Sequence, residues 1–250
     1  MKKRELKLTM PDGTTDAVLY TVDDSRPQPG VLLIPDIGGP RDVISQMAER
    51  IVNEGHTVLI PNPFYRTSKP PVFKFPRKPG DNATRQRMGE LLGPLTPDAI
   101  DADAAAYIDF LTSQPTTKPG GIGVVGFCIG GLLAFRAAAS RPDKAAVAVS
   151  FHGGGLYKAN DPKSAHLGLP KIKARLYFGH AVEDNSMNAE AIAELEKALQ
   201  AWRGRYESEV YEGAHHGWTM PDNSAYNQRQ AERALAKLMS VFKENLIENT

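Results

Sequence analysis

A single cysteine, Cys128, occupies a setting in which an enzyme nucleophile is expected. It is the central residue of Gly126-Phe127-Cys128-Ile129-Gly130-Gly131, between a β-branched run at 121–125 and a helix-like run at 132–139. A strand that turns abruptly into a helix strains its central residue and exposes that side chain, and small residues two positions away let strand and helix approach. Serine is the usual residue at such a bend, so the sequence predicts a thiol nucleophile in its place.

A thiol nucleophile needs a base, and the base needs a partner that orients it. The candidate acids Glu183 and Asp184 follow one predicted strand. The candidate bases His215 and His216 follow the last predicted strand. Reactive groups gather at the carboxyl ends of the strands in a parallel α/β sheet, so these residues should approach Cys128. Their order along the chain, nucleophile, acid and histidine, is the order of α/β hydrolases.

The elements that must position these residues alternate along the chain. Short apolar or alternating runs predict strands at 3–9, 16–22, 31–35, 57–61, 121–125, 145–151, 173–179 and 206–211. Apolar residues at helical spacing, with caps, predict helices at 43–52, 96–111, 132–139, 189–201 and 223–246. We therefore expect an α/β fold with a mostly parallel, twisted sheet, helices on both faces and an N-terminal antiparallel hairpin.

The segment 63–95 interrupts this alternation, and we expect an irregular loop or lid there. Its first part is rich in proline, and residues 66–87 hold seven basic side chains and one acid, Asp81. Residues 90–110 hold five acids and no base. The basic residues either form a rim that attracts an anionic substrate or pair with the acidic segment that follows them.

Composition limits the class of protein. At 250 residues, 41% of them apolar, the chain suits one α/β domain over 1–250. A net charge of +1 gives no reason to expect nucleic acid or an acidic membrane surface as a partner. One cysteine cannot form an internal disulfide. The basic start lacks an apolar stretch and no long apolar run occurs elsewhere, so we expect a soluble cytoplasmic protein.

Two patterns that would indicate a cofactor do not fit their context. Gly121-x-Gly123-x-x-Gly126 matches a dinucleotide fingerprint by letter but lies within the strand rather than after it. The adjacent His215 and His216 point to different sides and lack the usual spacing of zinc ligands. We expect neither a cofactor nor a metal.

With these segments identified, the chain resembles the dienelactone hydrolase family of α/β hydrolases. The resemblance spans nearly the whole chain and is carried by the strand 31–35, the bend around Cys128, the strand and acid ending at Asp184, and the segment 211–218. It implies that Cys128 is the nucleophile. It also implies that His216, directly before the glycine, is the base and that Asp184 orients it.

A hydrolase of this kind needs two donors for the oxyanion of its tetrahedral intermediate. The N–H of Ile129, at the start of the helix after Cys128, supplies one, since unpaired donors and the helix dipole converge there. We expect the second from Ile37, in the loop after the strand 31–35. Asp36 occupies the place where the family often has a glutamate that contacts the resting thiol, or it is a turn residue.

Substrate-binding residues are less well marked. Tyr65 and Arg66 follow a strand end and could line the site, with Arg66 binding an anion or forming an ion pair. Trp218 either walls an acyl pocket or is packed in the core. Family members use an arginine shortly after the catalytic histidine for a substrate carboxylate, but here Met220 is the fourth residue after His216 with no arginine between them. The dienelactone itself is therefore doubtful as the substrate.

The sequence thus predicts a cofactor-free hydrolase that cleaves a small-molecule ester or lactone through an acyl-cysteine intermediate. A thioesterase with the same triad and a non-catalytic binding protein of the same fold are the alternatives. His152 and His180, which also follow strands, are further candidates for contact with substrate. We expect a monomer or a homodimer.

Overall fold

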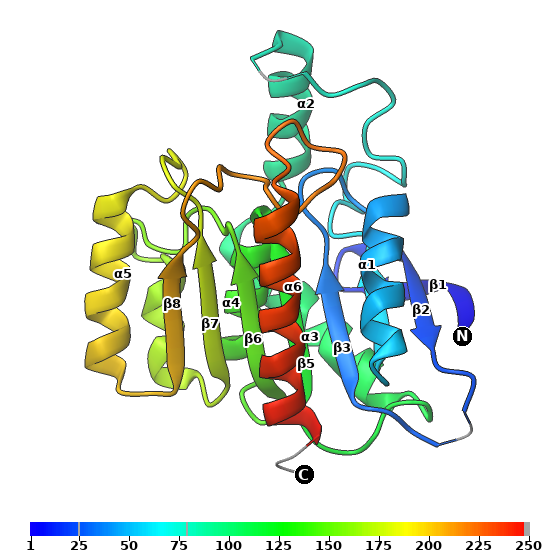
Figure 1. Cartoon of the computed structure of the whole chain (residues 1–250). Helices are drawn as coiled ribbons and strands as arrows, with labels where there is room; N and C mark the ends of the chain where they lie inside the picture. Colours follow the sequence, from blue (N-terminus) through cyan, green and yellow to red (C-terminus); the bar gives the residue numbers. More distant parts are fainter. Residues whose placement is uncertain (25, 79, 248–250) are drawn as a thin grey trace.

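An eight-stranded sheet forms the centre of the computed structural model, which describes residues 1–24, 26–78 and 80–247. The strand order is β1-β2-β4-β3-β5-β6-β7-β8 (Figure 1). Both β1–β2 and β2–β4 are antiparallel, and every other neighbouring pair is parallel. The strands are β1 (Lys2–Met10), β2 (Gly13–Thr21), β3 (Gly30–Ile34), β4 (Thr57–Pro61), β5 (Ile122–Phe127), β6 (Ala145–Phe151), β7 (Arg175–His180) and β8 (Tyr206–Val210).

Helices cover both faces of this sheet (Figure 1). One face carries α1 (Asp42–Asn53) and α6 (Gln228–Phe242), and the other carries α3 (Pro97–Ser113), α4 (Ile129–Ser140) and α5 (Ala189–Trp202). Helix α2 (Asn82–Leu92) lies beyond the carboxyl ends of the parallel strands, above the sheet in Figure 1. A 3₁₀ segment (Ala165–Lys171) and a π-helical turn (Lys243–Ile247) complete the elements.

The central strands are apolar throughout because both of their faces are covered. Every residue of β3, β4 and β5 is buried. Along β3 the side chains alternate between two cores: Leu32 and Ile34 pack with α3 and α4, while Val31 and Leu33 pack with α1 and α6. This double burial explains why the sequence shows short continuous apolar runs rather than alternation.

The fold class expected from the sequence is confirmed, including the N-terminal hairpin and the mostly parallel sheet. The segment 63–95 requires a correction, since it is not irregular throughout but contains α2. Asp81 caps this helix by accepting a hydrogen bond from the N–H of Thr84 at 2.9 Å. Only Thr84 and Leu91 of α2 are buried, so the helix has almost no apolar periodicity by which it could be recognised.

The two edges of the sheet are β1 and β8. Strand β1 exposes five charged side chains along its length: Lys2, Lys3, Arg4, Glu5 and Lys7. Among the described helices, none has both the length and the apolarity that crossing a bilayer requires.

Candidate active site

Cys128 lies at a sharp bend between β5 and α4. Its backbone has φ 56° and ψ −122°, a conformation that L-residues rarely adopt, and its side chain is partly exposed. The bend requires glycine on either side. A Cβ on Gly126 would lie 1.8 Å from the carbonyl oxygen of Gly130, and a Cβ on Gly130 would lie 2.5 Å from the carbonyl oxygens of Ile34 and Pro35. The start of α4 is thus pressed against both β5 and the end of β3.

His216 and Asp184 form a hydrogen-bonded pair beside this bend. His216 Nδ1 lies 2.7 Å from Asp184 Oδ2. The other carboxylate oxygen, Oδ1, accepts hydrogen bonds from the N–H and the hydroxyl of Ser186 at 2.8 and 2.7 Å. Both oxygens of the buried carboxylate are therefore engaged, which fixes the orientation of the imidazole.

This pairing shifts the pKa of both groups. Burial opposes the charge on His216, but its hydrogen bonds with Asp184 and with the thiol of Cys128 outweigh burial and raise its pKa to about 10. Burial likewise opposes the charge on Asp184, and hydrogen bonds from His216 and Ser186 lower its pKa to about 2. The carboxylate of Asp184 and the thiol of Cys128 thus both favour the charged form of the same imidazole.

The residues expected to form the oxyanion hole pack against the segment 63–95. Ile37 is buried and Ile129 is half-buried, and both join an apolar cluster with Phe64, Val72 and Leu91. Within the described part of the chain, neither the N–H of Ile37 nor that of Ile129 has a protein acceptor. The segment 63–95 therefore packs on the side chains of the two residues whose N–H groups remain available.

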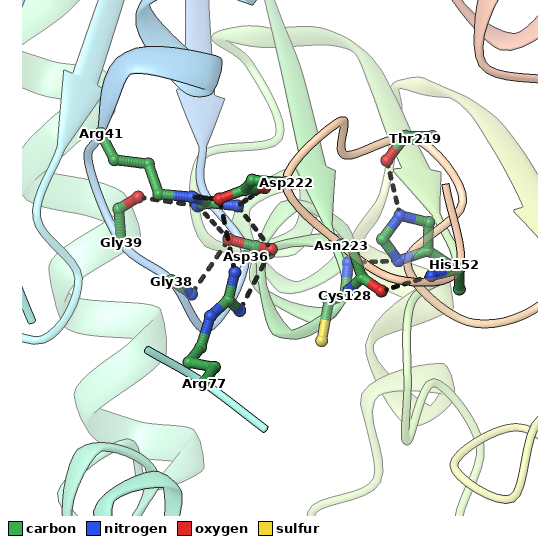
Figure 2. A network of polar contacts seen from close by, with 11 residues as sticks. Asp36, Gly38, Gly39, Arg41, Arg77, Cys128, His152, Thr219, Asp222 and Asn223 are labelled. Carbon is green, nitrogen blue, oxygen red and sulfur yellow. Dashed lines mark hydrogen bonds and ion pairs between the residues drawn. The ribbon is translucent and has the colours of Figure 1, made fainter. Parts of the chain in front are cut away.

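Asp36 belongs to a network of four charged side chains (Figure 2). Its Oδ1 accepts from the N–H of Gly38 at 3.0 Å, and its Oδ2 accepts from Nη2 of Arg41 at 3.1 Å. Arg41 also donates from Nε to Asp222 Oδ2 at 2.6 Å. Arg77, from the segment 63–95, lies 3.5 Å from Asp222 and 3.9 Å from Asp36. The network joins the loop after β3, the segment 63–95 and the loop after His216.

The position of Asp36 differs from the expectation for a residue that contacts the thiol. Its described contacts are to Gly38, Arg41 and Arg77. In Figure 2 the sulfur of Cys128 points away from this carboxylate. Ion pairing with arginine explains the difference, because a buried carboxylate is stabilised best by a guanidinium that engages both of its oxygens.

Arg66 is not free to bind an anion, and the expectation that it lines the site is corrected. Its guanidinium donates from Nη2 to Asp103 at 3.0 Å and from Nε to Asp12 at 2.8 Å. Tyr65 also donates to Asp103, at 2.9 Å. Only 12% of the Arg66 side chain and 6% of the Asp103 side chain are exposed. Arg66 therefore pairs with the acidic segment 90–110, as the second interpretation of the basic residues predicts.

Trp218 supports the histidine loop from within the core. It has no exposed surface, stacks on Tyr211 with ring centroids 5.0 Å apart, and meets His152 edge to face at 4.8 Å. It does not wall an open acyl pocket, because its indole is enclosed. His152 and His180 are also buried, so neither presents its ring to a substrate in this structure.

Several residues around the site were not predicted from the sequence. Ser186 was detectable in principle, since a serine two residues after an aspartate often closes a turn onto its carboxylate. The ion pair between Arg41 and Asp222 could not be predicted from a sequence pattern, because 181 positions separate the two residues. In the described residues, no cluster of three or more His, Cys, Asp or Glu side chains has a geometry that could hold a metal ion.

Comparisons with known proteins identify similar sequences and similar folds. The model of the dienelactone hydrolase family matches residues 15–246. A Synechocystis sp. protein provisionally named carboxymethylenebutenolidase is 28% identical over 221 residues, 87% of each chain. An Escherichia coli K12 protein of the same provisional name is 26% identical over 222 residues, covering 87% of this chain and 78% of the relative. A solved structure provisionally described as a Klebsiella pneumoniae dienelactone hydrolase has a TM-score of 0.84 at 20% identity, covering 97% of this chain and 98% of that one.

Proposed function

This chain belongs to the dienelactone hydrolase family and is a lactone or ester hydrolase, and we propose that it acts through an acyl-cysteine intermediate on Cys128. One observation carries the proposal. The imidazole of His216 is hydrogen-bonded to Asp184 at 2.7 Å and lies against the ring of His152, which accepts a hydrogen bond from the N–H of Cys128. This closeness supports the assignment of Cys128, His216 and Asp184 as nucleophile, base and orienting acid, the three groups that acyl transfer requires.

In the first half-reaction, His216 accepts the proton of the Cys128 thiol and the sulfur attacks the carbonyl carbon of the substrate. The carbonyl oxygen becomes an oxyanion, to which the N–H groups of Ile37 and Ile129 donate. When the tetrahedral intermediate collapses, the bond between carbon and the leaving oxygen breaks. That oxygen takes the proton from His216, and a thioester remains on Cys128.

In the second half-reaction, neutral His216 takes a proton from water, whose oxygen attacks the thioester. Collapse of this second intermediate returns the carboxylic acid product, and the proton on His216 restores the thiol. Asp184 supports both steps, because its hydrogen bond places the ring proton on Nδ1 and leaves Nε2 for the reacting groups. The raised pKa of His216 favours transfer of the thiol proton to its ring, which holds that proton until the leaving oxygen takes it.

The chemistry of the nucleophile narrows the substrate class. A thioester forms readily only when the leaving group is a good one, so enol esters, unsaturated lactones and thioesters are the favoured substrates. Relatives carry the provisional name carboxymethylenebutenolidase, which denotes action on an unsaturated lactone. This name supports unsaturated lactones as the substrate class. The lid segment that packs on Ile37 and Ile129 provides an apolar wall next to the reacting carbonyl.

Replacement of the nucleophile tests the proposal. Cys128→Ala is expected to abolish hydrolysis of a chromogenic short-chain ester and of an unsaturated lactone, while the far-UV circular dichroism stays unchanged. Intact-mass spectrometry of the wild type, quenched during turnover, should detect one acyl group, and the variant should carry none. Unaltered turnover by the Ala variant contradicts the proposal, and absence of turnover in the wild type across esters, lactones and thioesters favours a binding protein.

A further inference from the structure

His152 occupies an unusual position next to the proposed active site. It follows β6, the strand that pairs with β5, and its backbone φ of +40° lies in the left-handed region. It is 1% exposed. The mechanism above gives it no role. A buried, strained histidine one strand away from the nucleophile therefore calls for an explanation of its own.

The hydrogen bonds of His152 connect the nucleophile to the histidine loop. Its Nδ1 accepts from the backbone N–H of Cys128 at 3.1 Å. An acceptor nitrogen carries no proton, so the ring proton must be on Nε2. Nε2 lies 2.7 Å from the hydroxyl oxygen of Thr219, to which it donates. Figure 2 shows the imidazole between these two residues.

The ring of His152 also contacts the proposed base. The imidazoles of His152 and His216 meet edge to face with centroids 5.1 Å apart, and the indole of Trp218 packs at 4.8 Å. Burial lowers the pKa of His152 well below its ordinary value, and the neighbouring His216 lowers it further. His152 is therefore neutral, with its single ring proton committed to Thr219.

The backbone of Cys128 depends on these contacts. Its N–H has two acceptors, Nδ1 of His152 and the carbonyl oxygen of Phe151, each at 3.1 Å. A strained φ persists only where surrounding contacts hold it, and both contacts of this N–H come from the end of β6. Thr219 follows His216 by three residues, so the same imidazole anchors the loop that carries the base.

We propose that His152 is a positioning residue for the hydrolase: by joining the N–H of Cys128 to Thr219, it sets the separation between the nucleophilic sulfur and the imidazole of His216. The inference rests on the proposed function of Cys128 and His216 and deepens it. His152 itself does not touch the substrate. Its effect is on the geometry of the reacting pair, and a misplacement of about 1 Å costs about 100-fold in rate.

The side chain offers a graded set of variants. His152→Leu removes both hydrogen bonds. His152→Asn places an amide oxygen close to the position of Nδ1 and so keeps an acceptor for Cys128, and asparagine tolerates positive φ. Thr219→Val removes the acceptor of Nε2–H at nearly constant volume. His56→Leu is the matched control, since His56 is also buried but bonds to the carbonyl of Ile51.

Activity and stability of these variants separate a positioning role from a structural one. We expect His152→Leu to lower kcat about 100-fold with little change in KM, and His152→Asn to recover most of that loss. Thr219→Val should lower kcat less than His152→Leu. His56→Leu should lower Tm with kcat close to wild type. Equal kcat in His152→Leu and His56→Leu at matched loss of Tm would overturn the proposal, as would failure of His152→Asn to exceed the Leu variant.

Two measurements do not depend on turnover. The ¹⁵N shifts of the His152 ring should identify a neutral imidazole with its proton on Nε2, and a proton on Nδ1 would overturn the proposal. The rate at which iodoacetamide alkylates Cys128 should fall in His152→Leu and recover in His152→Asn.

If Cys128→Ala retains turnover while the ring shifts are as expected, the proposed reaction fails and the link between His152 and the bend remains. Should the Leu variant not fold, the Asn and Val variants still decide the question.

Discussion

At the scale of single residues, His216 and Asp184 form an ion pair whose contribution to stability depends on pH. Both groups differ from their ordinary behaviour in directions that favour the ion pair: the pKa of His216 is raised to about 10 and that of Asp184 is lowered to about 2. Each shift implies that the ionised form of that side chain stabilises the folded state relative to the unfolded state. The pair therefore contributes to stability as well as to the proposed chemistry.

Asp184→Asn removes this contribution within a defined pH window. The His216 contribution is fully present below its ordinary pKa of 6.5 and is lost as pH rises through about 10. The Asp184 contribution is present above 3.8 and is lost as pH falls through about 2. The difference in free energy of unfolding between wild type and variant should be largest between these ordinary values and shrink towards pH 10. Urea denaturation across this range measures it, and a difference that is constant with pH contradicts the assignment.

Some residues of the site could be predicted from the sequence and others could not. The nearness of Cys128, Asp184 and His216 was predictable, because all three follow strands of one sheet and so reach the same edge. The partner of Asp36 was not predictable, because the choice between a thiol and a guanidinium depends on where Arg41 and Asp222 meet in space. The catalytic roles of the three residues remain a prediction.

At the scale of elements, the crossing of β5 and α4 is the tightest contact in the site. Gly126 and Gly130 lie so close that a methyl group on the first would overlap the carbonyl of the second. Helix α2 presents the opposite case, because nothing lies within 4 Å of a Cβ placed on Gly89. The sequence indicated the first element clearly through its glycine spacing and did not indicate the second, whose few buried residues leave no pattern.

The same substitution should consequently have opposite effects in the two elements. Gly126→Ala is expected to destabilise the fold by about 3 kcal/mol, since the obstructing atoms are backbone and cannot rotate away. Gly89→Ala is expected to stabilise it by roughly 0.5–1 kcal/mol, since alanine lowers the entropy cost of ordering the helix. Thermal unfolding of the two variants checks both signs. Similar Tm values for the two would show that the crossing is less rigid than described.

At the scale of the whole molecule, Arg66 joins parts that are distant in sequence. It pairs with Asp12 in the turn of the N-terminal hairpin and with Asp103 in α3, while it belongs itself to the loop after β4. Because Asp103 is almost fully buried, its charge needs this guanidinium. The first strands are thereby tied to the helical layer behind the sheet.

Arg66→Leu should cost about 3 to 5 kcal/mol of unfolding free energy, because it leaves Asp103 buried with a hydroxyl as its remaining partner. The matched control is Lys163→Ala, whose ion pair with Asp98 is exposed and should contribute less than about 1 kcal/mol. Chemical denaturation of both variants provides the comparison. Equal losses would mean that Asp103 is better solvated than its burial indicates.

The charged side chains along β1 have a consequence for how copies of this protein meet. An outer strand offers unpaired N–H and C=O groups to any other extended chain, and such pairing propagates into aggregates. Another extended chain that paired with β1 would have to remove water from the charged groups of Lys3, Arg4 and Lys7, which opposes such pairing. The charges on β1 thus make this edge of the sheet a poor template for adding a further strand.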